Sequence, residues 1–343
     1  MVLAAQIEKE IGEAVAMTKD IVLCFDRFFV KPIMVLLKSI EISNPGEQFI
    51  IHIVFSGEGK KDSLKALLQD VVSQEMFTFN FYEIDDKLLA SCPIRKGDYV
   101  NISTYYRILL PALLPETVER VLYLDGDMLV VDGISELWDI NLDNYGAAVV
   151  PCIHYDNPNE FIRLGLDVRE GYFNAGFMLV NLTYWRKNEI QDKTMRFIQN
   201  HPDCCKKHDQ DALNFILSGN LLYLSIRYNF QRIFYEKDFS FSKKLVSDVN
   251  TALNKICIVH YCDLEKPWHR ECFHPLKDVW IYVARKIPNL KFKMKYKYTG
   301  MRKVKFIIKN FLTKLGLIKE SQVEYTVNFE KISKNLTEEL ERL

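Results

Sequence analysis

The sequence predicts an α/β fold built on a mostly parallel sheet that is flanked by helices. From Asp20 onward, short apolar runs alternate with segments whose apolar residues recur at helical spacing. Strands that alternate with helices favour βαβ units with right-handed crossovers. The chain has 343 residues, of which 48% are hydrophobic, so it can bury one large core or two unequal domains.

The first part of the chain supplies three strands and two helices. We expect strands at residues 21–25, 49–55 and 77–84. The helix after the first strand ends at residues 44–46, which are Asn-Pro-Gly. The second helix carries one apolar face, formed by Leu64, Leu67, Leu68 and Val71. Ligands of such sheets bind beyond the carboxyl ends of the strands, where Asp26 lies.

Two carboxylates interrupt the apolar run at residues 121–131. We interpret this run as a buried strand that ends in acid, in which alternation points Asp125 and Asp127 the same way. Two like charges at this spacing resist burial unless a cation lies between them, and oxygen ligands suit Mn²⁺ or Mg²⁺. Gly126 would let a phosphate approach the backbone. An acidic turn that merely closes a strand is the alternative, and the motif alone favours it.

Three later segments place polar residues in apolar surroundings. Residues 103–110 predict a helix that carries Arg107, which needs an anionic partner if it is buried. A structural ion pair and a substrate contact explain this arginine equally well. Residues 146–151 predict a strand of small residues, and residues 172–181 predict an apolar strand in which Asn174 has small neighbours. These small residues leave room for a close contact.

Polar residues also mark the start of a helix and the tip of a strand. At residues 208–214, a helix cap formed by Asp209 or a neighbour explains one or two of the polar side chains but not all of them. Residues 256–261 predict a strand with His260 at its tip. A lone histidine is more often structural, but this one could complete a metal site with two carboxylates from another strand.

Composition indicates a cytoplasmic protein. Lysine plus arginine and aspartate plus glutamate each number 45, so the net charge suggests no polyanionic partner. The 8 cysteines form no framework spacing and no CxxC pair, which is typical of reduced thiols. Residues 1–19 lack the basic start and apolar stretch of a signal peptide, and no run approaches the ~20 apolar residues of a spanning helix. Met17 could be an alternative start.

In combination, these short motifs resemble glycosyltransferase family 8, and within it the bacterial lipooligosaccharide and lipopolysaccharide galactosyltransferases and glucosyltransferases. The resemblance spans roughly residues 20–272. Its anchors occur in the family's order: Asp26, Tyr106-Arg107, Leu122-Tyr123-Leu124-Asp125-Gly126-Asp127, Phe173-Asn174-Ala175-Gly176, Asp209-Gln210-Asp211, His260-Tyr261-Cys262 and Lys266-Pro267-Trp268-His269-Arg270.

The resemblance implies a nucleotide-diphospho-sugar transferase fold of the GT-A type, and transfer of a hexose from a UDP-sugar with retention of configuration. Asp125, Asp127 and His260 would hold Mn²⁺, with Mg²⁺ as the other possible ion, and Lys266 would contact a phosphate oxygen. A metal ion and a lysine would stabilise the charge that develops on the departing β-phosphate.

The other matching positions surround the nucleotide and the donor sugar. Asp26 would lie where the family holds the uridine, with Cys24 beside it, and Arg107 would lie close to both sugar and nucleotide. The positions around the donor sugar are Asn174, Asp209 and Gln210.

Gln210 matches the family's position near the anomeric carbon of the donor sugar. Its neutral amide is a poor nucleophile. We therefore favour a front-face route in which the departing phosphate takes the acceptor's proton. In this route Gln210 and Asp209 position or stabilise the cation-like sugar.

Three residues depart from the family pattern. Val150 takes the place of an aspartate that commonly hydrogen-bonds the donor sugar, which puts galactose in doubt as the donor. Asp263 replaces a glycine near the pyrophosphate, where a carboxylate would repel phosphate unless it turns away or pairs with Lys266. Phe28 replaces a polar residue that often touches the nucleotide.

The C-terminal segment is basic. Ten lysines and arginines lie between residues 290 and 319 without an acid. From Val304 the apolar residues share one helical face, which suits an anionic membrane surface. A helix that docks on the catalytic domain is the alternative, whereas nucleic acid would have no use for the apolar stripe. Residues 320–343 are more acidic and could form a final helix.

We therefore expect an N-terminal extension at 1–19, a catalytic domain at 20–287 and a membrane-associating region at 288–343. The expected activity is metal-dependent, retaining transfer from a UDP-hexose to a glycan or glycolipid acceptor, in lipopolysaccharide, lipooligosaccharide or other cell-surface saccharide synthesis. The protein would be cytoplasmic and peripherally bound to the inner face of the cell membrane. A catalytically weak sugar-nucleotide-binding or scaffold protein is the alternative from another class.

Overall fold

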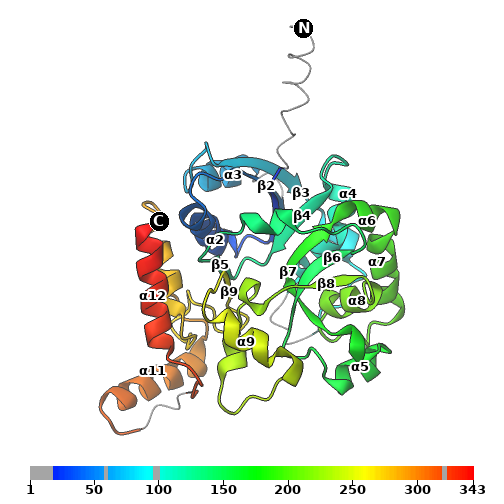
Figure 1. Ribbon diagram of the computed structural model, residues 1–343. Coiled ribbons are helices and arrows are strands. Elements are labelled where there is room, and N and C mark those ends of the chain that lie inside the picture. The colour runs from blue at the N-terminus through cyan, green and yellow to red at the C-terminus, as the bar shows by residue number, and fades with distance from the viewer. Residues whose placement is uncertain (1–17, 58–60, 96–100, 319–322) are drawn as a thin grey trace.

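The computed structural model describes residues 18–57, 61–95, 101–318 and 323–343. The expected N-terminal extension, including Met17, therefore lies almost entirely outside the described residues. The described chain forms a central sheet with helices on both faces (Figure 1). The predicted α/β class is confirmed.

Seven strands form the central sheet, in the order β3-β2-β1-β4-β7-β6-β8. Among the strands of the described residues, β7 alone runs antiparallel to its neighbours, so the sheet is mostly parallel, as predicted. A second sheet pairs β5 with β9 in antiparallel register. The strands are β1 (Asp20–Phe25), β2 (Phe49–Phe55), β3 (Phe77–Glu83), β4 (Arg120–Leu124), β5 (Met128–Val130), β6 (Ala147–Pro151), β7 (Phe173–Asn181), β8 (Leu221–Tyr223) and β9 (Ile258–His260).

Two apolar clusters cover the faces of the sheet, because successive strand residues point to opposite sides. In β1, Ile21 and Leu23 belong to one cluster and Val22 to the other. The first cluster includes residues of α2, α10 and α12, and the second includes residues of α6, α7 and α8. The helices are α2 (Val30–Ser43), α3 (Lys61–Gln69), α4 (Leu110–Leu113), α5 (Pro158–Leu164), α6 (Leu182–Lys187), α7 (Ile190–Asn200), α8 (Asp209–Ile216), α9 (Val246–Ala252), α10 (Lys277–Arg285), α11 (Gly300–Lys314) and α12 (Phe329–Arg342).

One local prediction was wrong. The apolar run at 121–131 is not one strand, because the chain turns at Gly126 and Asp127 and continues as β5 in the second sheet. The helix predicted at 103–110 is confirmed as a 3₁₀ helix at Ile102–Leu109 that leads into α4. The corrected strand end matters for function, because the turn carries both carboxylates.

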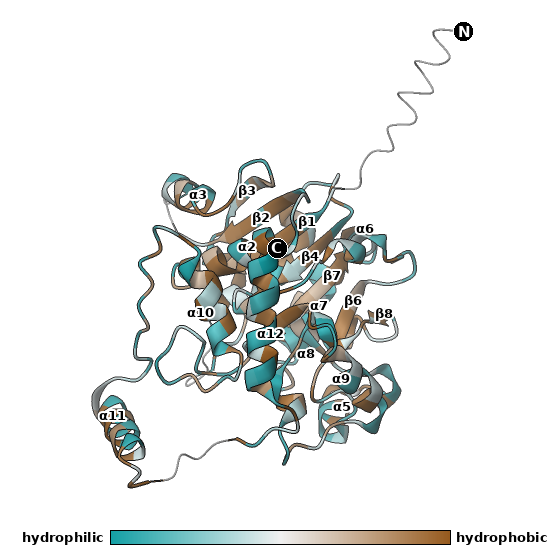
Figure 2. Ribbon diagram, turned by 60° about the vertical axis from the view of Figure 1, so that its left-hand side comes forward, coloured by the Kyte–Doolittle hydropathy of each residue, from teal (hydrophilic) through white to brown (hydrophobic). Residues whose placement is uncertain are grey.

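The C-terminal region contains two helices with different surroundings. Helix α11 has no buried residue and stands away from the body of the molecule (Figure 2). Its apolar stripe is exposed, including Ile308 at 51% and Phe311 at 61%. Phe306 is its ring contact with the body, through Phe273 and Tyr296. The structure therefore gives no support to the alternative in which the apolar face of this helix docks on the catalytic domain.

Helix α12 instead packs against α10 and completes the core. Its buried residues are Phe329, Leu336 and Leu340, which repeat at helical spacing on one face. The ring of Phe329 contacts those of Phe230 and Tyr235, which lie in the main body. The sequence grouped residues 288–343 into one region, whereas the structure separates an exposed helix from a core helix. None of the described helices has the length and apolar character needed to cross a membrane.

This difference predicts that the same substitution has a large effect on stability in α12 and little effect in α11. Leu336→Ala should lower the free energy of unfolding by about 2–5 kcal/mol, because it empties a buried site. Leu315→Ala, at the exposed end of α11, should change it by no more than about 0.5 kcal/mol. Chemical denaturation of both variants measures the difference. Equal stability of the two variants would contradict the packing of α12.

Candidate active site

The Asp-Gly-Asp turn joins the two sheets. The N–H of Asp125 donates to the carbonyl of Gly176 on β7 (2.8 Å), and the N–H of Tyr261 donates to the carbonyl of Asp127 (3.0 Å). Gly126 packs against α2, where a Cβ would come within 3.0 Å of the side chains of Phe29 and Ile33. Close packing is therefore a sufficient reason for the glycine. Its predicted contact with phosphate stays a prediction.

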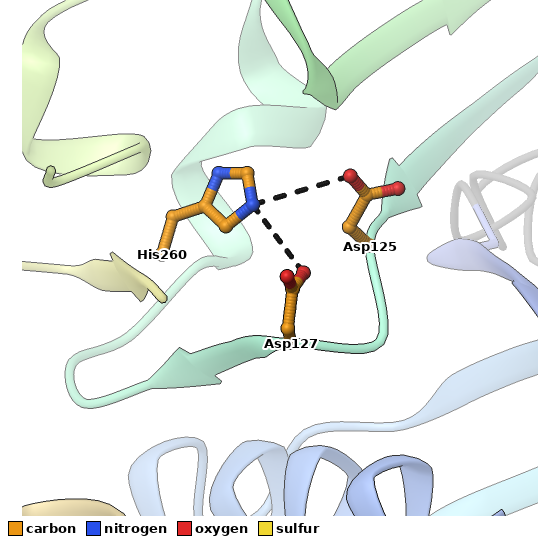
Figure 3. A group of neighbouring side chains, drawn as sticks. All are labelled: Asp125, Asp127 and His260. Atoms are coloured by element: carbon orange, nitrogen blue, oxygen red, sulfur yellow. Dashed lines mark ion pairs between the residues drawn. The ribbon is translucent and has the colours of Figure 1, made fainter. Parts of the chain in front are cut away.

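The turn and strand β9 bring the three predicted metal ligands together. The Nε2 atom of His260 lies 3.3 Å from Oδ1 of Asp127 and 4.0 Å from Oδ2 of Asp125 (Figure 3). One ligand atom from each residue lies within 4.8 Å of the others. A Cβ at Gly176 would lie 2.5 Å from the imidazole and 2.8 Å from Oδ2 of Asp125. Glycine at this position therefore keeps the ligand cluster open.

Charge neutralisation stabilises this cluster. Burial alone would raise the pKa of Asp127, but Lys266 and His260 lower it well below its usual range. The Nζ atom of Lys266 donates to Oδ2 of Asp127 at 2.6 Å. Burial alone would lower the pKa of His260, but Cys262 and Asp127 raise it well above its usual value. Two carboxylates and an imidazole that converge in this way provide a donor set for a divalent ion.

Arg107 is buried and connects two of the acids. Its Nη2 atom lies 3.2 Å from Oδ1 of Asp125, and its Nε atom lies 2.9 Å from Oδ2 of Asp209. Its Nε–H donates to the carbonyl of Thr104 (3.0 Å), and its guanidinium lies 4.4 Å from the centre of the Tyr123 ring. These contacts give Arg107 the structural ion pairs that the sequence left open.

Asp209 is the first residue of α8 and does not cap it. His208, its neighbour, occupies the cap position with positive φ and makes no capping hydrogen bond through its side chain, so the predicted side-chain cap from Asp209 or a neighbour was wrong. Burial raises the pKa of Asp209, although Arg107 opposes this shift. Despite the ion pair, Oδ2 of Asp209 is a buried oxygen that accepts no hydrogen bond within the described part of the chain. This oxygen therefore has an unused acceptor position.

Asn174 and Gln210 lie side by side. The Oε1 atom of Gln210 accepts from the backbone N–H of Ala175 (3.1 Å) and from Nδ2 of Asn174 (3.4 Å). The Nε2 atom of Gln210 donates to the hydroxyl of Tyr172 (3.2 Å). The amide of Gln210 is therefore held in one orientation.

A cavity of about 500 Å³ brings most of these groups together. Asp26 instead lines an adjoining cavity of about 720 Å³, and Phe25 and Asn101 line both. The first cavity is lined by the predicted residues Cys24, Arg107, Asp125, Gly126, Asp127, Asn174, Asp209, Gln210, His260 and Lys266. The structure therefore places every predicted site residue at one of two neighbouring cavities.

The three departures from the family pattern have different surroundings. Val150 is fully buried in the core and does not line the first cavity, whose wall at this strand end is formed by residues 152–154. Asp263 pairs with Arg232, through contacts of 2.7 and 2.9 Å, rather than with Lys266. Phe28 is 73% exposed at the second cavity. Asp263 is thus neutralised, which removes the reason to expect that it repels phosphate.

Sequence reasoning missed two residues that support the site. Asn229 is fully buried and contacts both His260 and Asn174. Tyr172 holds Gln210 and donates to Asp211. An amide between two aromatic residues, in Tyr228-Asn229-Phe230, was a weak signal of a buried polar contact.

Comparisons with known proteins agree with this geometry. The model of the family described as "Glycosyl transferase family 8" matches residues 20–272. General stress protein A of Bacillus subtilis is 30% identical over 269 residues, which cover 76% of this chain and 91% of that protein. The lipopolysaccharide 1,3-galactosyltransferase of Salmonella typhimurium is 27% identical over 272 residues, or 77% of each chain.

Among solved structures, the galactosyltransferase LgtC, crystallised with donor and acceptor sugar analogues, superposes with a TM-score of 0.71. It is 25% identical, and the match covers 78% of this chain and 96% of that one. Because the family model spans well over half of the sequence, the chain belongs to glycosyltransferase family 8 and is a glycosyltransferase.

Proposed function

We propose that the protein transfers a hexose from a UDP-sugar to a glycan acceptor with retention of configuration, in lipopolysaccharide or related cell-surface saccharide synthesis. The observation that carries this proposal is the convergence of Asp125, Asp127 and His260 beside Lys266 in one cavity. The similarity to lipopolysaccharide galactosyl- and glucosyltransferases supports the class of acceptor.

The three clustered residues would hold Mn²⁺, with Mg²⁺ as the second possible ion. A bound ion would supply a Lewis acid for the negative charge that develops on the leaving diphosphate. The imidazole favours Mn²⁺, because Mg²⁺ selects oxygen ligands more strictly. Lys266 would exchange its contact with Asp127 for a phosphate oxygen and so help to stabilise the leaving group.

The residues expected around the donor sugar, Asn174, Asp209 and Gln210, favour a front-face route of transfer. The bond between C1 and the β-phosphate oxygen breaks, the acceptor oxygen bonds to C1 from the same face, and its proton passes to the departing phosphate. Gln210 is neutral and its oxygen is held by Ala175, so its role is to position the sugar rather than to attack it. The buried oxygen of Asp209 would accept a hydrogen bond from a sugar hydroxyl.

Asp26 and Cys24 would contact the nucleotide. Asp26 lines the neighbouring cavity, and its carboxylate accepts a hydrogen bond from the N–H of Phe28 (2.8 Å). Burial raises the pKa of Cys24 well above its usual value, so its thiol stays neutral beside the acids. A neutral thiol suits a packing role better than a nucleophilic one.

Helix α11 would bind an anionic membrane surface at the inner face of the cell membrane. Its exposed apolar stripe has no partner among the described residues, and lysines such as Lys305 and Lys314 flank it. Each lysine near an anionic leaflet contributes about 1 kcal/mol, and each buried apolar side chain about 1.5–3 kcal/mol before ordering costs. A lipid-linked acceptor would then meet the enzyme at that surface.

The metal site predicts a loss of transfer in Asp127→Asn. Removing one charged ligand should lower the Mn²⁺-dependent rate by at least about 100-fold and leave the fold intact. The same substitution at exposed Asp143, away from the cavity, is the control and should leave the rate unchanged. UDP release measured with and without a chelator tests this. Full turnover by Asp127→Asn in the presence of chelator would refute the site.

The donor preference follows from the wall at the end of β6. Val150 lies in the core, so a contact with the donor sugar falls to residues 152–154, none of which is an aspartate, and UDP-galactose should not be uniquely preferred. UDP-glucose or an N-acetylated hexosamine donor should be used at least as well. Competition between donors, read by mass spectrometry of the product, measures this preference. Exclusive use of UDP-galactose would show that another residue makes the contact.

Membrane binding is best tested by substitution, because deleting residues 290–343 would also remove the buried side chains of α12. Replacing Ile308, Phe311 and Leu315 together with serine should weaken binding to anionic vesicles by at least about 100-fold. Thermal stability and activity on a short soluble acceptor should not change, because the three side chains are exposed.

The matched control is Ile162→Ser, which removes an exposed apolar side chain from α5. It should co-sediment with anionic vesicles as the unmodified protein does, and this binding should weaken as salt is added. If the triple variant co-sedimented equally well, α11 would not be the anchor.

A further inference from the structure

A series of five hydrogen bonds, buried at its two ends, runs from His260 of the metal cluster past Asn174 and Gln210 to Asp211. Its links are His260 Nδ1 to Asn229 Oδ1 (2.9 Å), Asn229 Nδ2 to Asn174 Oδ1 (2.9 Å), Asn174 Nδ2 to Gln210 Oε1 (3.4 Å), Gln210 Nε2 to Tyr172 Oη (3.2 Å) and Tyr172 Oη to Asp211 Oδ1 (2.5 Å). Each hydrogen bond joins residues from different segments of the polypeptide.

Two backbone N–H groups fix the donor-to-acceptor direction of this series of hydrogen bonds. The N–H of Ala175 donates to Oε1 of Gln210 (3.1 Å), and the N–H of Gly176 donates to Oδ1 of Asn174 (3.0 Å). A backbone N–H can only donate, so these two atoms must be the amide oxygens. The amide nitrogens of both side chains therefore point toward the buried Asp211.

The far end of the chain is also fixed. Asp211 is fully buried and receives two hydrogen bonds from the guanidinium of Arg163, at 2.8 Å each, and one from the N–H of Lys207 (2.6 Å). An ionised carboxylate only accepts, so the hydroxyl of Tyr172 must donate to it and accept from Gln210. Every donor in this series of hydrogen bonds consequently points away from His260.

This direction determines the role of each imidazole nitrogen of His260. Because Oδ1 of Asn174 is an acceptor, Asn229 must present its nitrogen to it and its oxygen to His260. The Nδ1 atom of His260 must then carry a hydrogen. Its Nε2 atom faces Asp127 and Asp125, so this is the nitrogen that would bind a metal ion in place of a proton.

We propose that Asn229 is a positioning residue that holds His260 in the tautomer and orientation required for metal binding and couples this ligand to Asn174 on the sugar side. The inference rests on the proposed metal site. Asn229 then has two separable effects. Its side-chain oxygen accepts a hydrogen bond from the metal ligand His260, and its side-chain nitrogen donates one to Asn174. Partners of metal-bound histidines typically change metal affinity 10–100-fold when they are removed.

Two substitutions at this position separate the two effects. Asn229→Leu removes both hydrogen bonds with little change in volume, whereas Asn229→Asp keeps an oxygen for Nδ1–H and loses the donor to Asn174. Mn²⁺ affinity is measured without donor, from the signal of free Mn²⁺ in electron paramagnetic resonance. The kcat and KM for the UDP-sugar are measured at saturating Mn²⁺.

Asn229→Leu should weaken Mn²⁺ binding about 10–100-fold. Asn229→Asp should bind Mn²⁺ at least as well as the unmodified protein and yet show a lower kcat for the sugar donor. Asn174→Asp, which keeps both acceptor contacts and loses the donation to Gln210, should also retain Mn²⁺ affinity.

A buried asparagine elsewhere provides the matched control. Asn44 is hydrogen-bonded to Ile40 and Ile134, neither of which lines the cavity, so Asn44→Leu should lower the melting temperature without changing Mn²⁺ affinity. If Asn229→Leu does not fold, Asn229→Asp decides alone through its expected split between metal affinity and kcat.

The outcomes distinguish failure of the proposed metal site from failure of the proposed role of Asn229. Absence of Mn²⁺ binding by the unmodified protein would refute the proposed metal site. Normal Mn²⁺ binding by both the unmodified protein and Asn229→Leu would refute the role of Asn229 alone. Loss of Mn²⁺ binding in Asn229→Asp would also refute it, because the oxygen that His260 requires is still present.

Discussion

The structure of the site depends on the cost of holding several carboxylates together in a largely buried cavity. Asp125, Asp127 and Asp209 repel one another, and burial disfavours the charged forms of Asp127 and Asp209. Arg107 lies between Asp125 and Asp209, while Lys266 and His260 neutralise Asp127. Removing Arg107 would leave Asp209 as an uncompensated buried charge, which is strongly destabilising. The cations therefore maintain the geometry into which a divalent ion and a diphosphate would fit.

The path of the polypeptide brings the two acids of the turn and His260 together. Strand β4 ends at Leu124, and the turn that follows carries both acids and leads into the separate sheet formed by β5 and β9. In that sheet Met128 pairs with His260, which places the imidazole opposite the turn. Gly126 and Gly176 are the positions where any side chain would crowd α2 or the ligand cluster. Fold and site are thus specified by the same few residues.

Much of the fold could be predicted from the sequence, because strands and helices follow from apolar periodicity. The reversed direction of β7 could not, since strand direction depends on the path of the connections and not on composition. The family motifs predicted the residues around the cavities, but Asn229 belongs to none of those motifs and depends on contacts between distant segments. The apolar stripe of α11 was evident, whereas the burial of α12 required its partner α10 to be known.

The central claim is that Asp125, Asp127 and His260 form one divalent metal site next to Lys266. Crystals grown with Mn²⁺ and UDP, measured at the manganese absorption edge, test it most directly. We predict one strong anomalous peak within bonding distance of a carboxylate oxygen of Asp125, a carboxylate oxygen of Asp127 and Nε2 of His260, with the diphosphate on its open side. A peak that these three residues do not share, or UDP bound with no manganese beside it, would contradict the account.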